Sequence, residues 1–220
     1  MVIDSKLNNS HLGSNVYLLL RESLISGKLK PNDRLKIREL AEQFGTSVTP
    51  VRDAILQLSK EHALVMKSPR DIRVPVLTRQ QYLENRSLRI ELEGLAAYTA
   101  AKKATSEKLE LLENNINENL LAIHEKDIGK SLVLNSAFHI MLASIAEMPL
   151  LESFISTLWM RTGGVVAIAY EHFSEEMAIH HHWEVLEALK NGDSEIAKYA
   201  IHSDIYNGNQ IMARYIELDG

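Results

Sequence analysis

One short stretch constrains the fold of this chain more than any other: residues 44–54, FGTSVTPVRDA. Gly45 follows a run of apolar residues at helical spacing, as a glycine does when it ends a helix. Ser47 stands where an N-cap residue belongs, and Pro50 falls in the first turn of the next helix, where a missing N–H costs little. A tight glycine turn between two helices, the second opening with small hydroxyls and one long cation, is typical of a helix-turn-helix.

The flanking residues extend this pattern to a winged helix-turn-helix. Apolar spacing and turn residues predict, in order, helix 14–26, helix 37–44, a helix from Ser47, strand 63–67, turn 68–71 and strand 72–76. In such a fold the first turn of the third helix enters the major groove of DNA. A generic three-helix bundle with an ordinary capped helix is the alternative.

Candidate DNA contacts follow from that docking. The hydroxyls of Ser47 and Thr49 suit phosphate oxygens, and Arg52 suits a guanine edge or a phosphate. Further cations stand on the preceding helix and on the wing, at Arg38, Arg70 and Arg73.

Charge is divided unevenly along the chain. The net charge of the 220 residues is −5, but residues 1–77 hold 12 Lys and Arg against 8 Asp and Glu, whereas residues 78–220 hold 12 against 21. A basic binding module joined to an acidic domain has this distribution. The sequence has no cysteine, no long uncharged apolar run and no apolar N-terminal segment. We therefore expect a cytoplasmic protein without disulfides, a membrane span or a signal peptide.

Long helices fill the second part of the chain. We place the boundary of two domains, 1–76 and 78–220, at Thr78, which has the features of an N-cap. About six helices are expected beyond it, at 78–103, 106–125, 128–146, 149–171, 174–190 and 193–217. The predicted fold class is mainly α, with an N-terminal winged helix-turn-helix and a C-terminal all-helical bundle.

Polar side chains occur on or beside apolar helix faces of the bundle. Arg89 and Glu93, one turn apart, flank a stripe that includes Leu92 and Leu95, and a surface ion pair is the plain interpretation of this spacing.

Histidines and an acid mark three later helices. Asn135 and His139 share a helix face at metal-ligand spacing, although a hydrogen-bonded core histidine is commoner. Of three successive histidines, His182 is in line with apolar positions, and Asp204 turns inward on the last helix.

The run LISGKLKPNDRLKIRELAEQFGTSVTPVRDAILQLSKEHALV closely resembles the DNA-binding domain of the GntR superfamily of bacterial transcription regulators. The resemblance implies DNA contacts at Arg38, Ser47, Thr49, Arg52 and the wing around Arg70. There are two departures. Val48 stands where the family often has Arg, and Asp71 stands where the wing usually has Gly, so we expect different operator contacts and a different wing tip.

The second part resembles the FCD effector domain of the FadR-type branch, with a helix count similar to the VanR-type subgroup. RIELE at 89–93, NSAFH at 135–139 and HWEVLEALKNGD at 182–193 carry the resemblance. It implies an effector site at Arg89 and Glu93. It also implies a divalent metal held by Asn135, His139, His182 and Asp204.

The family usually has Asp and His where this chain has Asn135 and Asp204. The donors that remain are acceptable for zinc, nickel or manganese. The competing interpretation is a hydrogen-bond network in which Asn135 and Asp204 bind the two imidazoles without a metal.

The expected protein is a homodimeric transcription regulator or repressor. It binds a double-stranded DNA operator and responds to a small effector, an organic acid. The alternative is a metal-dependent hydrolase or lyase acting through His139, His182 and Asp204. We do not expect an enzyme, because no motif supplies a separate general base and the DNA-binding part would have no purpose in one.

Overall fold

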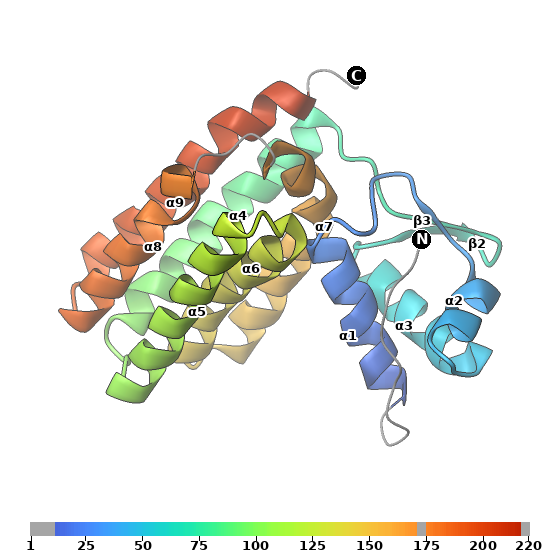
Figure 1. The fold of residues 1–220 in the computed structure, drawn as a ribbon, viewed down its shortest axis with the longest axis horizontal. Helices are drawn as coiled ribbons and strands as arrows, with labels where there is room; N and C mark the ends of the chain where they lie inside the picture. Colours follow the sequence, from blue (N-terminus) through green and yellow to red (C-terminus); the bar gives the residue numbers. More distant parts are fainter. Residues whose placement is uncertain (1–11, 171–174, 217–220) are drawn as a thin grey trace.

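The computed structural model describes residues 12–170 and 175–216. In chain order the elements are α1 (Leu12–Ile25), β1 (Arg34–Leu35), α2 (Ile37–Gln43), α3 (Val48–Lys60), β2 (Val65–Ser68), β3 (Asp71–Arg73), α4 (Arg79–Ala100), α5 (Ser106–His124), α6 (Ile128–Ile145), α7 (Pro149–Tyr170), α8 (Glu175–Lys190) and α9 (Ser194–Ile216). A small head of α1–α3 and the strands stands at one side of a bundle of long helices (Figure 1). The mainly helical prediction is confirmed, while residues 171, 174 and 217, at expected helix ends, lie outside the described residues.

Two glycine turns shape the head. Gly27 after α1 and Gly45 between α2 and α3 have φ of 71° and 64°, the left-handed conformation that glycine adopts without steric cost. The turn at Gly45 sets α3 across α2, so that α3 buries one apolar face against α1 and α2. The buried side chains are Val51, Ala54, Ile55 and Leu58.

The wing is an antiparallel three-stranded sheet in the order β1-β3-β2. Strands β2 and β3 are shorter than expected, and β1 was not expected, because two residues are too few to carry an alternating pattern. In the ladder between β1 and β3, Arg34 lies opposite Arg73 and Leu35 lies opposite Ile72. The central strand of the wing is therefore β3.

Thr78 is the N-cap of α4, as predicted. Its hydroxyl accepts the backbone N–H of Gln81, and the Gln81 side chain accepts the N–H of Thr78, so two otherwise unpaired donors are satisfied. Helix α4 packs along α9, and α9 along α8 (Figure 1). Helix α6 packs against α5 and α7 and also meets α4.

Within the described residues, α6 is the one helix long and apolar enough to cross a membrane by length and composition, with a mean hydropathy of 1.3 over 18 residues. Its apolar character also suits its place inside the bundle, where it packs on α4, α5 and α7 and also meets α1 of the head. Buried Phe138 and Leu142 are part of the main core, and the same helix carries the buried polar His139.

Head and bundle share one continuous apolar core, which includes residues from Val16 in α1 to Ile205 in α9. They meet where α1 and the turn after it lie on α7. A Cβ atom on Gly163 of α7 would lie 2.2 Å from the carbonyl oxygen of Leu24, so this close approach requires a glycine. Beside it, Arg21 Nε donates to Ser156 Oγ at 2.9 Å.

The inward face of α4 differs from the predicted one. Leu95 is 44 % exposed, whereas Arg89 and Glu93 are 8 % and 0 % exposed. The interpretation of these two charges as a surface ion pair is therefore wrong. Small side chains such as Ala96, Ala97 and Ala100 line the rest of the buried face, and they let α4 approach its neighbours closely enough to enclose the two charges.

Candidate DNA interface and effector site

The first turn of α3 presents the predicted polar residues to solvent. Ser47 occupies the N-cap position with an extended backbone, but its side chain makes no capping hydrogen bond, so the hydroxyl is left for another partner. Thr49 and Arg52 are exposed, while Val51 between them is fully buried. Because of the helical repeat, Val51 packs in the core while the polar side chains of the same turn face solvent.

A cleft of about 770 Å³ opens between the wing and helices α2 and α3. Its lining includes Met66 and Pro69 of the wing and Val48 and Leu56 of α3. Five cations also line it: Arg34, Lys36, Arg38, Arg52 and Arg70. The structure therefore brings together residues that the sequence placed on three separate elements, and it adds Arg34 and Lys36, which sequence reasoning missed.

The cations of this face differ in their partners. Within the described residues, no hydrogen bond or ion pair engages the side chains of Arg38, Arg52 and Arg70, and all three are exposed. Arg73 is occupied: its guanidinium donates to Asp71 Oδ1 at 2.9 Å and to Asn32 Oδ1 at 3.1 Å. Three of the four arginines predicted to meet DNA are thus available for an anion, and the fourth holds the wing together.

In the bundle, the ion pair Arg89–Glu93 is part of a buried polar cluster. Arg89 Nε donates to Glu93 Oε1 at 2.6 Å, and Nη2 donates to Oε2 at 3.3 Å, so the interaction is bidentate. The guanidinium also lies over the Trp159 ring, with Cζ 3.9 Å from its centroid. Burial by itself raises the pKa of Glu93, but the charges of Arg89 and His139 outweigh it and hold that pKa below its ordinary value.

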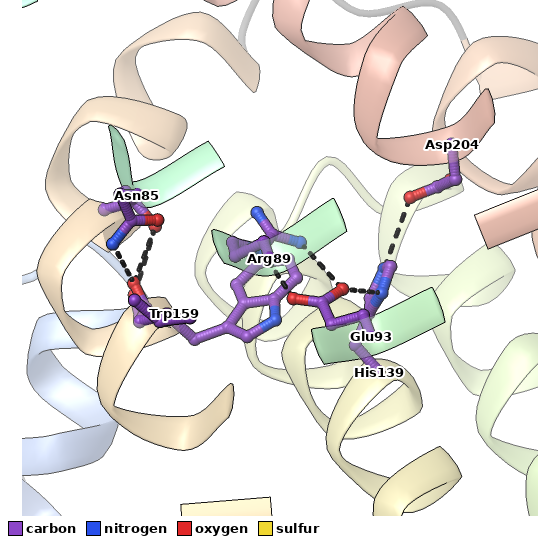
Figure 2. Close-up of polar contacts among 8 residues, drawn as sticks. Asn85, Arg89, Glu93, His139, Trp159 and Asp204 are labelled. Atoms are coloured by element: carbon purple, nitrogen blue, oxygen red, sulfur yellow. Dashed lines mark hydrogen bonds and ion pairs between the residues drawn. The ribbon is translucent and has the colours of Figure 1, made fainter. Parts of the chain in front are cut away.

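His139 continues the cluster from Glu93 to the last helix. Its Nδ1 lies 2.6 Å from Glu93 Oε2, and its Nε2 lies 3.3 Å from Asp204 Oδ2 (Figure 2). Burial lowers the pKa of His139, but the Glu93 carboxylate and then Asp204 raise it by more, so it ends above its ordinary value. A fully buried imidazole between two carboxylates is therefore protonated more readily than a free imidazole.

His182 is the counterpart of His139 and has the opposite electrostatics. It is fully buried and stacked on Phe138, and its Nε2 is 3.7 Å from Asp204 Oδ1. Burial lowers its pKa to about 3, so it stays neutral. Within a single site, the surroundings thus favour protonation of His139 and oppose protonation of His182.

Three donors of the expected metal set converge. His139, His182 and Asp204 each offer a ligand atom within 4.8 Å of the others. Asn135, one turn before His139, is half-buried, and within the described residues its Oδ1 has no hydrogen-bond partner. These residues fit a divalent ion: a neutral His182 is ready to coordinate, and Glu93 orients His139 from its Nδ1 side, as carboxylates do behind metal-bound histidines.

Two residues of this site escaped sequence reasoning. Trp159 lies against Arg89 and His139, and its buried indole N–H has no hydrogen-bond partner within the described residues. Asn85, one turn before Arg89, donates to the backbone carbonyl of Leu158, which ties α4 to α7 (Figure 2). Asn85 could have been found from the sequence, because it precedes Arg89 by the same four residues that separate Arg89 from Glu93. Trp159 could not, because its sequence position does not distinguish it from an ordinary aromatic residue of the core.

Two family models match the chain. Residues 12–74 match the bacterial regulatory proteins of the gntR family, and residues 85–207 match the FCD domain. The chain belongs to the GntR family of bacterial regulators and carries an FCD domain. The resemblance on which the expected function rested is thereby confirmed.

Relatives of this GntR–FCD protein carry matching names. It is 31 % identical over 83 % of its length, and 84 % of the relative, to the HTH-type transcriptional regulator McbR of Escherichia coli. It is 25 % identical to the HTH-type transcriptional repressor RspR of the same organism, with 91 % and 89 % of the two chains covered. The solved structure of E. coli McbR/YncC has a TM-score of 0.85 at 29 % identity and covers 93 % of this chain and 98 % of that one.

The GntR–FCD protein is therefore a DNA-binding transcription regulator and not an enzyme. The alternative of a metal-dependent hydrolase or lyase gains no support, since these relatives are named as regulators of transcription. GntR heads bind DNA operators and FCD domains bind small-molecule effectors.

Proposed function

We propose that this regulator works in the cytoplasm as a homodimer whose operator binding changes when a small organic acid enters the FCD site. A dimer suits the DNA: two recognition helices related by a two-fold axis read half-sites about 34 Å apart. We divide the chain into residues 1–76 for DNA and 78–220 for effector binding and dimerisation. The polar cluster buried among helices α4, α6, α7, α8 and α9 carries the proposal.

On the DNA side, we propose contacts by Ser47, Thr49 and Arg52 in the first turn of α3. Arg38 and Arg70 flank them across the cleft. We propose that Arg73 supports the wing and does not itself contact DNA, because its guanidinium already donates to Asp71 and Asn32.

On the effector side, the proposed anchor is Arg89, oriented by Glu93 on one side and by the Trp159 ring on the other. Arginine suits two-pronged recognition of a carboxylate. Glu93 supports this anchor and His139 instead of facing the ligand, since both of its oxygens are within 3.3 Å of those two side chains. A polar effector would also satisfy the indole N–H of Trp159 and the carbonyl of Asn135.

A divalent metal, with zinc, nickel or manganese as the candidates, is proposed at His139, His182 and Asp204, with Asn135 as a fourth donor. When bound, it would supply a Lewis-acidic centre that attracts an anionic effector. The residues of the chain would hold it and shield it from bulk water, because His139 and His182 are fully buried and Asp204 is largely so.

The test begins with DNA that the wild-type protein itself selects from a random-sequence duplex library. Its affinity for the selected duplex is then measured with and without each member of a panel of small organic acids. We expect a two-fold symmetric selected site, one dimer per duplex, and at least one acid that changes the affinity. Selection of no sequence, or an affinity unchanged by any acid that binds the protein, would contradict the proposal.

A further inference from the structure

The tip of the wing is held by side chains. Pro69 and Arg70 form the turn between β2 and β3, and Asp71 follows without the left-handed backbone that a glycine would permit there. The hydroxyl of Ser68 accepts the N–H of Arg70 at 3.3 Å. The ladder to β2 is irregular between Met66 and Ser68, so main-chain pairing alone does not fix the tip.

Arg34 reaches the tip from the neighbouring strand. Its Nε and Nη2 both donate to the carbonyl oxygen of Arg70, at 3.1 and 2.5 Å. Its own backbone is paired with Arg73 in the central strand. A planar guanidinium that donates twice to one oxygen fixes both direction and distance, which a single flexible ammonium does not. The turn is thereby tied to β1.

The three arginines around the wing therefore have different tasks. Arg34 holds the Arg70 carbonyl, and Arg73 holds Asp71 and Asn32. The Arg70 side chain is exposed and has no hydrogen bond or ion pair within the described residues. Two cations build the wing and the third projects from it.

We propose that Arg34 is the positioning residue of the wing: it directs Arg70 at the DNA and makes no essential DNA contact of its own. The proposal depends on the DNA interface given under Proposed function. It accounts for the absence of a glycine at the tip, because contacts from Arg34 and Arg73 determine a turn that the backbone leaves open. The competing role for Arg34 is an independent phosphate contact in the cleft.

A double-mutant cycle separates these roles. The variants are Arg34→Gln, Arg70→Ala and the two combined, measured on the duplex selected by the wild type. If Arg34 acts through Arg70, each single substitution weakens DNA binding by roughly tenfold, within the range of one lost contact. The double variant then binds DNA as tightly as the single variant with the lower affinity. If the two residues contact DNA independently, the losses multiply.

Lys36→Gln is the matched control, because Lys36 is exposed and lines the same cleft. The substitution removes one positive charge, as Arg34→Gln does. Its effect should multiply with that of Arg70→Ala. Arg34→Lys keeps the charge without the planar fork, so a positioning role predicts a defect close to that of Arg34→Gln, and a charge role predicts rescue. Circular dichroism and thermal midpoints matching the wild type establish that each variant is folded, as the exposed position of Arg34 leads us to expect.

Hydroxyl-radical footprints supply a second readout. Arg34→Gln should lose the protection beside the recognition helix that Arg70→Ala also loses, and keep the protection from α3. Multiplicative losses, rescue by lysine, or an intact wing footprint in Arg34→Gln would overturn the proposal. A wild-type footprint without wing protection would overturn it too, whereas absence of all protection would also contradict the proposed DNA interface.

Discussion

At the scale of single residues, the same side-chain chemistry has different consequences in the two halves of the chain. Arg52 is exposed on α3, where solvent screens its charge, and its removal leaves nothing buried behind. Arg89 is 8 % exposed and is bound to a fully buried carboxylate. Substitution of Arg52 should therefore affect DNA binding alone, and substitution of Arg89 should affect folding as well.

Arg52→Ala should abolish specific operator binding and leave the fold intact. A lost base contact weakens binding by about 1–3 kcal/mol, whereas a lost phosphate contact lowers the salt slope by about one unit. Titration of the selected duplex at several salt concentrations distinguishes the two, with Gln57→Ala, an exposed position on the same helix, as the control. Unchanged affinity and salt slope would remove Arg52 from the interface.

Arg89→Met should destabilise the protein by about 3 kcal/mol, because it leaves Glu93 charged in the core with only His139 as a partner. Adding Glu93→Gln should recover part of that loss. Urea denaturation of both variants measures the effect. A loss below about 0.5 kcal/mol would mean that the pair behaves as a solvent-exposed one.

Effector binding should separate from this stability effect. The double variant Arg89→Met/Glu93→Gln should no longer gain thermal stability from the acid that stabilises the wild type, although its fold is partly restored. An equal gain in both proteins would show that Arg89 does not anchor the effector.

At the scale of elements, α7 connects the two functional regions. Trp159 and the Leu158 carbonyl face the proposed effector site, and Gly163, little more than a turn along, lies on the backbone of α1. Helix α7 thus provides a direct backbone contact between the proposed effector site and the head.

Gly163→Ala should force α1 and α7 apart, because the added Cβ would lie 2.2 Å from the Leu24 carbonyl oxygen and 2.7 Å from the Ile25 Cα atom. We expect a loss of about 1–3 kcal/mol in the free energy of unfolding, the usual cost of overpacking. Gly129→Ala in α6 is the control, since its Cβ would meet nothing nearer than 3.7 Å and it should be neutral or slightly stabilising. Equal denaturation curves for both variants would argue against a tight seam.

At the scale of the whole molecule, the candidate metal site exists only where α6, α8 and α9 meet. Zinc added to protein freed of metal by a chelator should raise the thermal midpoint, by an amount equivalent to about 2.7 kcal/mol at one hundred times the Kd. His182→Gln should abolish the rise, while His180→Gln, whose side chain is 64 % exposed, should not. Absence of any rise with zinc, nickel or manganese would favour the metal-free network.

The same binding should release protons. The carboxylates of Glu93 and Asp204 raise the pKa of His139 above its ordinary value, so a metal competes with a proton for this residue, whereas His182, with a pKa of about 3, has no proton to lose at neutral pH. Zinc affinity should therefore fall as pH is lowered through the pKa of His139. Calorimetry in two buffers of different ionisation enthalpy, repeated at several pH values, counts the protons, and a count of zero at every pH would mean that His139 is not a ligand.

Much of this molecule follows from local sequence alone. Gly45, Ser47 and Pro50 set the helix-turn-helix because backbone freedom, capping and a fixed φ act over a few residues. Thr78 begins the bundle for the same reason, and apolar spacing gives most helix ends to within a few residues. The inward direction of His139 and His182 was likewise predictable, because helical periodicity determines it.

Tertiary structure decided what lies between those helices. Whether Arg89 and Glu93 are buried depends on how closely α4, α6 and α7 pack, and no periodicity within α4 gives that distance. The two-residue strand β1, the part of Arg34 in the wing and the place of Trp159 beside Arg89 likewise arise from chain segments distant in sequence. Local rules determine which way a side chain points, and only packing determines what it meets.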